Sequence, residues 1–330
     1  GQIMKSTVPL ETGESSLTTN IGSVQNAGIE LGVNFGVIRN QNFTWDVNVA
    51  FARNWSKIKE LPSGDDVSNN WFIGERLNVL RDYTYAGVIT ADGVTMHTIN
   101  GDKHYTLQEV YDKYGPKSPN KLKWYEGQMA VNDWNDDGKI NDEDKQIYGC
   151  TDPKWTGSLS STMTYKGFDF SFMLYTKQGQ WSRSYFHEQY MDISDRGRQK
   201  MSFDYYIPAG TPVLDKATGY ITYLETPQMG AYPYPNNYEK TGGGYFSKSS
   251  SGVRYQKTSF VKVKNITLGY TFPKKWMSKI AVKHLRLYVN VLNPFCFTGY
   301  DGFDPEWASA NLTDGGPASV TYQIGANIKF

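Results

Sequence analysis

Residues 132–146, NDWNDDGKINDEDKQ, place oxygen-bearing side chains at the spacing of a calcium-binding loop. The template D-x-D/N-x-D/N-G-x5-E is matched, with aspartate replacing the final glutamate, by Asp133, Asn135, Asp137, Gly138 and Asp144. Calcium prefers many flexible oxygen ligands, and glycine permits the sharp turn that gathers them. The sequence therefore predicts a structural calcium ion held by the side chains of Asp133, Asn135, Asp137 and Asp144 and by the backbone carbonyl of Lys139.

The surroundings of this loop are unusual for such a site. Calcium loops of this type normally join two helices, whereas the flanking residues here are rich in aromatic, Thr, Ser and Gly residues and are strand-like from Trp155 onward. We expect a helix-free loop that braces a long connection, with the shorter Asp144 carboxylate weakening the site or recruiting Asn141 or water. The alternative is a surface turn, rich in Asp, Asn and Gly, that holds no metal.

No catalytic pattern is found elsewhere. The sequence has no H-E-x-x-H, nucleophile elbow or P-loop, and its histidines are dispersed, at His97, His104, His187 and His284. Cys150 and Cys296 match no metal or redox spacing, so we expect unpaired thiols, with a disulfide as the alternative in an oxidising compartment. The chain is therefore not expected to be an enzyme.

Composition suits strands and polar loops. Of the 330 residues, 15% are aromatic, with 24 Tyr and 9 Trp beside 32 Gly, and the mean hydropathy is −0.56. The 34 Lys and Arg nearly balance the 33 Asp and Glu, so we expect no nucleic-acid partner. No apolar run is long enough for a membrane helix, and the first residues contain no signal-peptide core. The chain is either soluble or crosses a membrane as a β-barrel.

Strict alternation of apolar and polar residues predicts seven strands. In residues 43–51, FTWDVNVAF, the odd-numbered positions are apolar and the intervening ones are mostly polar. Each run approaches the roughly 9 to 11 residues of a tilted transmembrane strand. The predicted strands are residues 28–38, 43–51, 155–165, 168–175, 260–272, 282–292 and 320–330, with an eighth near residues 3–10.

Connection lengths favour a barrel over a soluble β-sandwich. Tight connections at IRNQN, YKGF and FPKKWMSKIAVKH alternate with long ones at residues 55–154, 176–254 and 293–317. Outer-membrane barrels combine short periplasmic turns with long extracellular loops. The two longest connections are therefore predicted to be extracellular, and the first of them carries the cation site. The polar strand faces suit a wet lumen, and aromatic residues near strand ends suit the membrane interfaces.

Several ordered motifs resemble the C-terminal part of SusC/RagA-type TonB-dependent outer-membrane transporters. They are NIGSVQNAGIELGVNF, DWNDDGKINDEDKQIYGCTDPKWTGSLS, SFVKVKNITLGYTFP and NPFCFTGYDGFDPE, followed by the ending YQIGANIKF. The resemblance extends from about residue 20 to residue 330. It implies that residues 1–330 are a C-terminal segment of an all-β, antiparallel, 22-stranded transmembrane barrel. It also implies that the family's plug domain and N-terminal extension lie upstream and are absent from this chain, so that the rest of the barrel must be supplied separately.

The resemblance further implies a function. Such transporters import a large nutrient, a glycan or a peptide, across the outer membrane of a Gram-negative bacterium, with a SusD-like surface lipoprotein as lid and the TonB complex as energy source. The long loops, as the surface-exposed part, are expected to contact the lipoprotein, and the terminal Phe330 resembles an outer-membrane assembly signal. The alternatives are a secreted, calcium-stabilised β-sandwich that binds a ligand, which would be soluble without detergent, and an outer-membrane enzyme. The sequence identifies no ligand-binding residues.

Overall fold

The computed structural model describes residues 3–6, 17–20, 22–115, 124–190, 204–234, 254–309 and 318–330. The chain divides into two compact units. The first comprises Gly1–Leu80, Gly149–Ser182 and Lys257–Phe330, and the second comprises Arg81–Tyr148 and Arg183–Gln256. The second unit is thus drawn almost entirely from the two long connections that the sequence predicts. No helix in the described residues is long and apolar enough to span a membrane.

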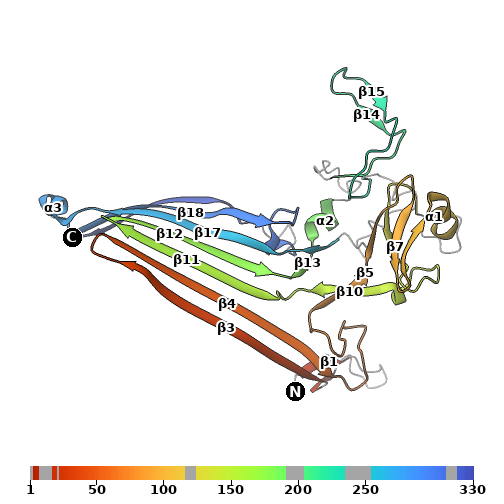
Figure 1. The fold of residues 1–330 in the computed structure, drawn as a ribbon, viewed down its shortest axis with the longest axis horizontal. Helices are drawn as coiled ribbons and strands as arrows, with labels where there is room; N and C mark the ends of the chain where they lie inside the picture. The colour runs from red at the N-terminus through yellow and green to blue at the C-terminus, as the bar shows by residue number, and fades with distance from the viewer. Residues whose placement is uncertain are drawn as a thin grey trace. The chain divides into compact units, whose positions relative to one another are not determined.

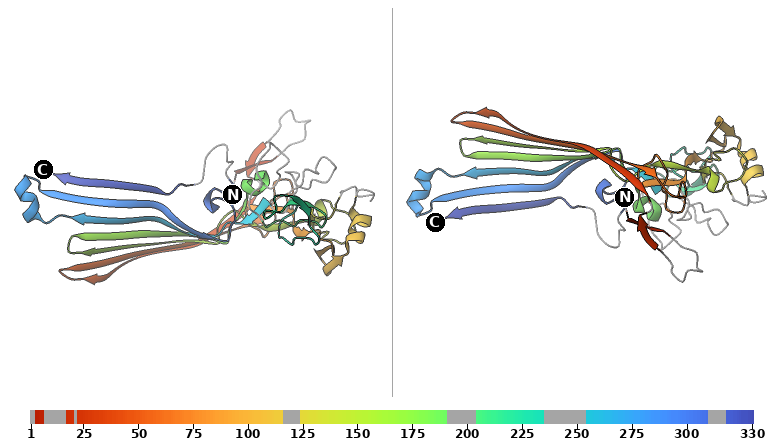
Figure 2. Two further views of the ribbon diagram at one scale, coloured as in Figure 1. Left: turned by 90° about the horizontal axis from the view of Figure 1, so that it is seen from above. Right: turned by 90° about the horizontal axis from the view of Figure 1, so that it is seen from below.

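A single antiparallel sheet of seven strands dominates the first unit (Figures 1 and 2). The order is β19-β18-β17-β12-β11-β4-β3. The strands are β3 (Ser23–Arg39), β4 (Phe43–Glu60), β11 (Trp155–Tyr165), β12 (Phe168–Gln178), β17 (Phe260–Thr271), β18 (His284–Thr298) and β19 (Thr321–Lys329). These are the seven strands predicted from alternation. β3, β4 and β18 extend several residues beyond their predicted ends, because hydrogen-bonded pairing continues where alternation has stopped.

The strand register aligns apolar side chains in some rows across the sheet and polar side chains in the neighbouring rows. One row of paired residues crosses all seven strands and is apolar throughout: Ile38, Trp45, Met163, Phe170, Leu268, Val289 and Ile324. Its neighbour, which points to the opposite face, carries Gly36, Asp46, Thr162, Ser171, Thr267, Asn290 and Gln323. Since successive side chains of a strand point to opposite faces, the sheet has one apolar and one polar face.

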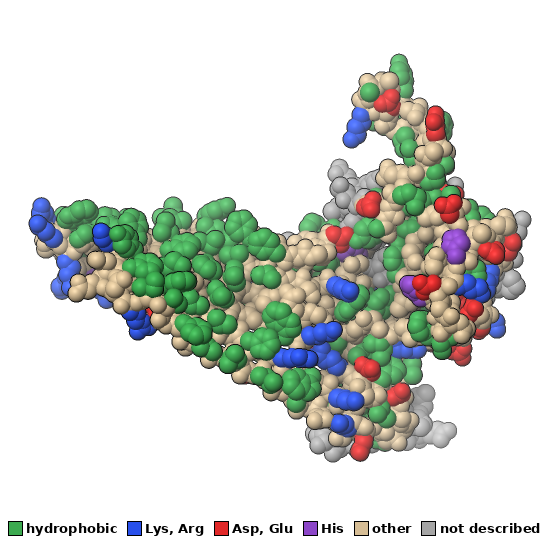
Figure 3. Space-filling view, viewed as in Figure 1, with side chains coloured by type: hydrophobic (Ala, Val, Ile, Leu, Met, Phe, Trp, Pro, Cys, Tyr) green, Lys and Arg blue, Asp and Glu red, His purple; other side chains and the backbone are tan. Residues whose placement is uncertain are grey.

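The apolar face is exposed rather than covered. Large hydrophobic side chains along it remain accessible on every described strand of the sheet, including Leu31, Phe170, Leu268, Val289 and Ile324, and Figure 3 shows hydrophobic side chains spread over this region. A β-sandwich would bury this face against a second sheet. All seven long strands lie instead in one sheet. The arrangement therefore disfavours the sandwich alternative and supports an apolar environment around the sheet.

The tight connections all lie at one end of the sheet. The connection from β17 to β18 is structured, with helix α3 (Lys274–Met277) and the 3₁₀ helix η5 (Ser278–Ile280). Met277 is buried, and the Val282 amide donates to its carbonyl at 3.2 Å. The eighth strand predicted near residues 3–10 is described only as β1 (Ile3–Ser6), because residues 7–10 lie outside the described residues. β1 pairs with β2 (Leu17–Asn20) in a separate ribbon and does not join the large sheet.

The connection after β18 folds back onto the polar face of β17. It contains the 3₁₀ helix η6 (Pro305–Trp307), and its acids hold a buried lysine. The Lys262 ammonium lies 2.7 Å from Asp304 Oδ1 and 2.6 Å from Glu306 Oε2.

Both cysteines are free, which confirms the expectation of unpaired thiols.

The second unit contains a cluster of buried hydrophobic residues that forms its core. Its centre is a buried cluster of Ile89, Val94, Met96, Tyr105, Val110, Tyr114, Trp124, Met129, Ala130, Val131, Tyr205 and Ile207. Helix α1 (Leu107–Tyr114) begins with a capping box in which Thr106 and Glu109 satisfy each other's backbone amides, and helix α2 spans Tyr185–Tyr190. Short ribbons pair β6 (Tyr85–Val88) with β9 (Met129–Val131), β7 (Val94–Thr98) with β8 (Gly101–Tyr105), and β14 (Pro212–Leu214) with β15 (Ile221–Tyr223). Two further ribbons, whose strands each belong partly to either unit, pair β5 (Val79–Tyr83) with β10 (Lys145–Cys150), and β13 (Trp181–Arg183) with β16 (Tyr255–Lys257).

Candidate metal centre

The predicted calcium loop lies between two strands. It follows β9 and leads into β10, and its last turn is the 3₁₀ helix η2 (Asp142–Asp144). The expectation of a loop without flanking helices is correct, although this one short 3₁₀ turn lies within it. Ile140 packs against the core cluster of the unit and fixes the middle of the loop to it.

Hydrogen bonds within the loop follow the spacing of the template. Asp133 Oδ2 accepts from the Gly138 amide at 2.8 Å, and Asp144 Oδ1 accepts from the Trp134 amide at 2.8 Å. The intervening turn is held by Asn135 and Asp137, whose side-chain oxygens accept from the amides two residues ahead. The first and last acids of the template are thereby tied to one folded loop.

Gly138 is required by geometry. Its φ is +83°, in the left-handed region that favours glycine. A Cβ at this position would also lie 2.6 Å from Cε of Lys113. Any side chain here would therefore strain the backbone and displace that lysine.

Asp133 is the most informative residue of the loop. Its side chain is 0% exposed, and its Oδ1 atom has no hydrogen-bond partner. The other oxygen, Oδ2, accepts from the Tyr114 hydroxyl at 2.6 Å and lies 3.5 Å from the Lys113 ammonium. A buried carboxylate oxygen without a partner is costly, and a cation beside it would remove that cost.

A second carboxylate of the loop, that of Asp144, is also buried and adds negative charge near Asp133. Asp144 is also 0% exposed. Burial raises the pKa of its carboxyl, and the negative charge of Asp133 raises it further. By contrast, Asp136, an acid outside the template, is paired with Lys103 at 2.8 Å, and this bond lowers its pKa. Asp133, by comparison, lies 3.5 Å from a single ammonium, that of Lys113, and has no short ion pair like that of Asp136.

The structure brings together only part of the predicted ligand set. Asp137 is exposed, and its carboxylate accepts a hydrogen bond from the Lys139 amide. Within the described residues, no three His, Cys, Asp or Glu side chains are grouped so as to hold a metal ion. Calcium at this loop would therefore depend on the two buried carboxylates together with amide and backbone oxygens, a mixed set that suits calcium.

Two residues of the site escape prediction from the motif. Lys113 and Tyr114 lie at the end of α1, 20 and 19 residues before Asp133 in sequence, but contact Asp133 directly. Burial and the hydrogen bond to Asp133 raise the pKa of Tyr114, so its phenol keeps the proton that it donates. Only the apolar periodicity of residues 107–114, which places Val110 and Tyr114 on one face, could have pointed to a helix packed nearby.

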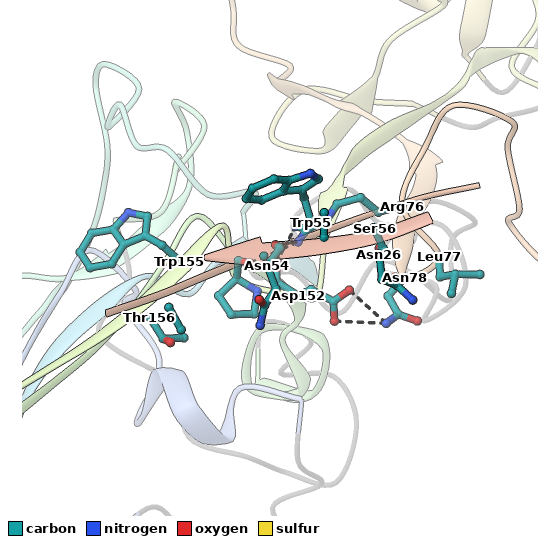
Figure 4. A pocket seen from close by; sticks show the side chains of 14 residues that line it. Asn26, Asn54, Trp55, Ser56, Arg76, Leu77, Asn78, Asp152, Trp155 and Thr156 are labelled. Carbon is teal, nitrogen blue, oxygen red and sulfur yellow. Dashed lines mark hydrogen bonds between the residues drawn. The ribbon is translucent and has the colours of Figure 1, made fainter. Parts of the chain in front are cut away.

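A separate pocket of about 670 Å³ lies within the first unit, among β3, β4, the start of β11 and the segments 76–78 and 152–153. Figure 4 shows Asn78 facing Asp152, whose two carboxylate oxygens each accept from the Asn78 amide group at 3.1 Å. Arg76 donates to the backbone carbonyls of Asn54 and Asp152. The partly exposed indoles of Trp55 and Trp155, with nearby amide side chains, can hold a polar ligand by stacking and hydrogen bonding.

No family model matches the chain, but similar proteins are found by sequence and by structure. TonB-dependent receptor SusC of Bacteroides thetaiotaomicron is 28% identical over 328 residues, which cover 98% of this chain and 28% of the receptor. TonB-dependent receptor P39 of Formosa agariphila is 28% identical over 356 residues, 98% of this chain and 32% of the receptor. The RagAB peptide transporter structure matches 99% of this chain and 32% of its own, with a TM-score of 0.63 and 17% identity.

These similarities confirm two predictions. The resemblance to SusC/RagA-type transporters extends over nearly the whole chain, and the fold is that of the matching part of the RagAB transporter structure. The chain spans about a third of the length of the relatives it matches.

Proposed function

Because this chain is a relative of SusC-type TonB-dependent receptors along nearly its whole length, we propose that it forms part of the wall and the surface loops of an outer-membrane nutrient importer. The complete transporter would take up a glycan or a peptide, with the TonB complex as its energy source and a SusD-like lipoprotein at the cell surface. The relatives are named as receptors, in line with a chain that is not an enzyme. The observation that carries the proposal is the two-faced sheet.

The apolar face fits lipid, and the polar face fits a water-filled lumen. Transmembrane barrels alternate in this way along every strand. On the polar face, Thr267 donates to Asn290, and Asn290 donates to Gln323 at 2.9 Å. Arg286 and Asp169 form a two-bonded ion pair on the same face. Such groups form hydrogen bonds with one another and with water, and placing them against hydrocarbon would cost free energy.

The sheet needs further strands on both sides to close. β3 and β19 are its edge strands, and an edge within a bilayer leaves backbone N–H and C=O groups unpaired. In the proposed importer, the rest of the barrel and the plug therefore come from residues other than these 330.

We propose that the two long connections face the cell surface and contact the lipoprotein. The short connections lie at one end of the sheet, and the long ones begin and end at the other, which is the asymmetry of outer-membrane barrels. Calcium at the Asp133 loop would brace the first of these connections by neutralising its buried carboxylates. RagAB is a peptide transporter, and the cargo proposed for this chain is a peptide or a glycan.

Uptake by the host bacterium tests the proposal. We expect deletion of the gene to abolish import of one labelled glycan or peptide, and inactivation of the TonB complex to do the same. The protein should fractionate with the outer membrane and require detergent for extraction. Recovery of the complete protein as a soluble monomer without detergent would contradict the proposal and favour the secreted β-sandwich alternative.

Deletion of Phe330 is expected to lower, by several-fold, the amount of transporter that reaches the outer membrane. Phe330 is 80% exposed at the end of the last strand, so its removal loses little packing, and the heat stability of assembled protein should hardly change. Protease accessibility in intact cells measures the surface level, and Phe330→Tyr serves as the control that keeps a terminal aromatic. Normal surface levels after the deletion would show that Phe330 is only a strand end.

A further inference from the structure

Seven basic side chains gather at the end of the large sheet that carries the tight connections, and together we call them the basic rim: Arg39, Lys166, Lys274, Lys275, Lys279, Lys283 and Lys329. The register places them at one end, because Tyr165 pairs with Phe168, Thr271 with Arg286, and Lys329 with His284. All seven are exposed. Figure 3 shows Lys and Arg side chains gathered at the end that bears α3.

The chain is nearly neutral overall, but its charges are unevenly distributed between the rim and the other residues. Residues 37–45, 162–168, 270–285 and 325–330 contain the seven basic residues and no Asp or Glu. The remainder of the chain then holds 34 − 7 = 27 basic residues against 33 acidic ones, a net charge of 27 − 33 = −6. The rim, in which only Arg39 is paired with a carboxylate, that of Asp46, is therefore oppositely charged to the rest of the chain.

The carboxylates nearest the rim do not neutralise its lysines. Asp46 pairs with Arg39 at 2.7 Å, and Asp169 pairs with Arg286. In the described part of the chain, the six rim lysines make no ion pair with a carboxylate. Six ammonium groups are thus available to an anionic partner.

Exposed apolar side chains are interleaved with these lysines. Trp276 is 54% exposed and Ile280 is 61% exposed, within the same structured connection as four of the lysines. Tyr165 and Phe330 are exposed directly beside Lys166 and Lys329. Aromatic rings with neighbouring lysines are typical of the membrane–water interface, where lysine stems lie along apolar surface and the ammonium reaches the headgroups.

We propose that the basic rim binds the anionic headgroups of phospholipids in the leaflet that surrounds the short connections, the periplasmic leaflet in the proposed function on which this inference rests. The rim borders the apolar face at its turns, where Lys166 and the four lysines of the β17–β18 connection lie, so these charges lie at headgroup depth when that face meets hydrocarbon, whereas Arg39 and Lys329 belong to the polar face. It also extends across seven strands, or six intervals of about 4.8 Å, roughly 30 Å in all. That width matches a row of headgroups rather than a pocket for one phosphate.

The test uses the complete transporter in lipid nanodiscs, with phosphatidylglycerol as the anionic probe and phosphatidylcholine as the neutral one. The variant Lys274→Gln, Lys275→Gln, Lys279→Gln, Lys283→Gln removes four rim charges. A matched control, Lys57→Gln, Lys59→Gln, Lys154→Gln, Lys216→Gln, removes four exposed charges outside the rim. Native mass spectrometry reports how strongly each protein retains one lipid over the other.

We expect the wild type to retain phosphatidylglycerol preferentially and the rim variant to lose at least about tenfold of that preference, because each lysine near an anionic surface contributes about fivefold. The control should stay close to wild type, four Lys→Arg changes in the rim should keep the preference, and added salt should weaken it. Equal retention by the rim variant and the wild type would overturn the proposal. A protein that enters nanodiscs without lipid preference would contradict only the rim, whereas one that never enters a bilayer would contradict the proposed function.

Discussion

Alanine at both Asp133 and Asp137 is expected to abolish calcium binding by the complete transporter and to make its thermal stability independent of calcium. Asp133 presents a fully buried carboxylate oxygen without a hydrogen-bond partner. Asp144, the second buried carboxylate, has a pKa raised by burial and by the charge of Asp133. A divalent cation between such groups would replace repulsion with attraction, and the double variant removes one of these buried carboxylates, Asp133, together with the exposed template carboxylate of Asp137.

The expected size of the effect follows from mass action. Calcium at a hundredfold excess over its dissociation constant stabilises the folded state by about 2.7 kcal/mol, provided that the unfolded chain does not bind it. A chelator should therefore lower the melting temperature of the wild type and leave that of the double variant unchanged. Calorimetric titration measures the binding directly.

Glu143→Gln is the matched control for this experiment. Glu143 belongs to the same loop but lies outside the template, and glutamine can still accept the hydrogen bond from Asn135. The control should titrate with calcium as the wild type does. An undiminished calcium signal in the double variant would place the ion elsewhere and leave residues 133–144 as a turn held by its own hydrogen bonds.

How far the sequence predicts this structure differs between its two units. In the large sheet, alternation was sufficient, because one face must be apolar and the other polar along the whole of each strand. Strand ends were less predictable: β4 continues to Glu60, where pairing with β3 and burial of Ile58 outweigh the loss of the apolar pattern. The stretch near Ile3 has strand character but pairs with Leu17–Asn20, and local pattern cannot identify a pairing partner.

The long connections were the least predictable part. Their length indicated surface loops, yet they build a unit with its own core, in which Trp124 and Tyr205 come from different connections. The calcium motif predicted the turn and its acids from spacing alone. It could not predict that Tyr114 and Lys113 would contact Asp133, or that Lys103 would pair with Asp136, since those contacts depend on tertiary packing.

Arginine at Ile324 is expected to prevent most of the protein from reaching the outer membrane, whereas arginine at the adjacent Gln323 should be tolerated. Ile324 is 86% exposed on the apolar face, in register with Val289 and, through it, with Leu268. Gln323 belongs to the neighbouring polar row and accepts one hydrogen bond, from Asn290. The two positions share a strand and differ in the face to which they point.

The expected difference is set by the solvent that each face meets. A charged arginine on the lipid face costs about 2 to 4 kcal/mol near the bilayer midplane, whereas substitutions facing the lumen leave the charge in water. Loss of the Asn290 bond at Gln323→Arg should cost no more than about 1 kcal/mol. Denaturant unfolding of the assembled protein measures both values, and membrane fractionation measures assembly. If the two variants behaved alike, the apolar face would be meeting water or another protein surface, and the row from Ile38 to Ile324 would be a docking surface instead of a lipid-facing wall.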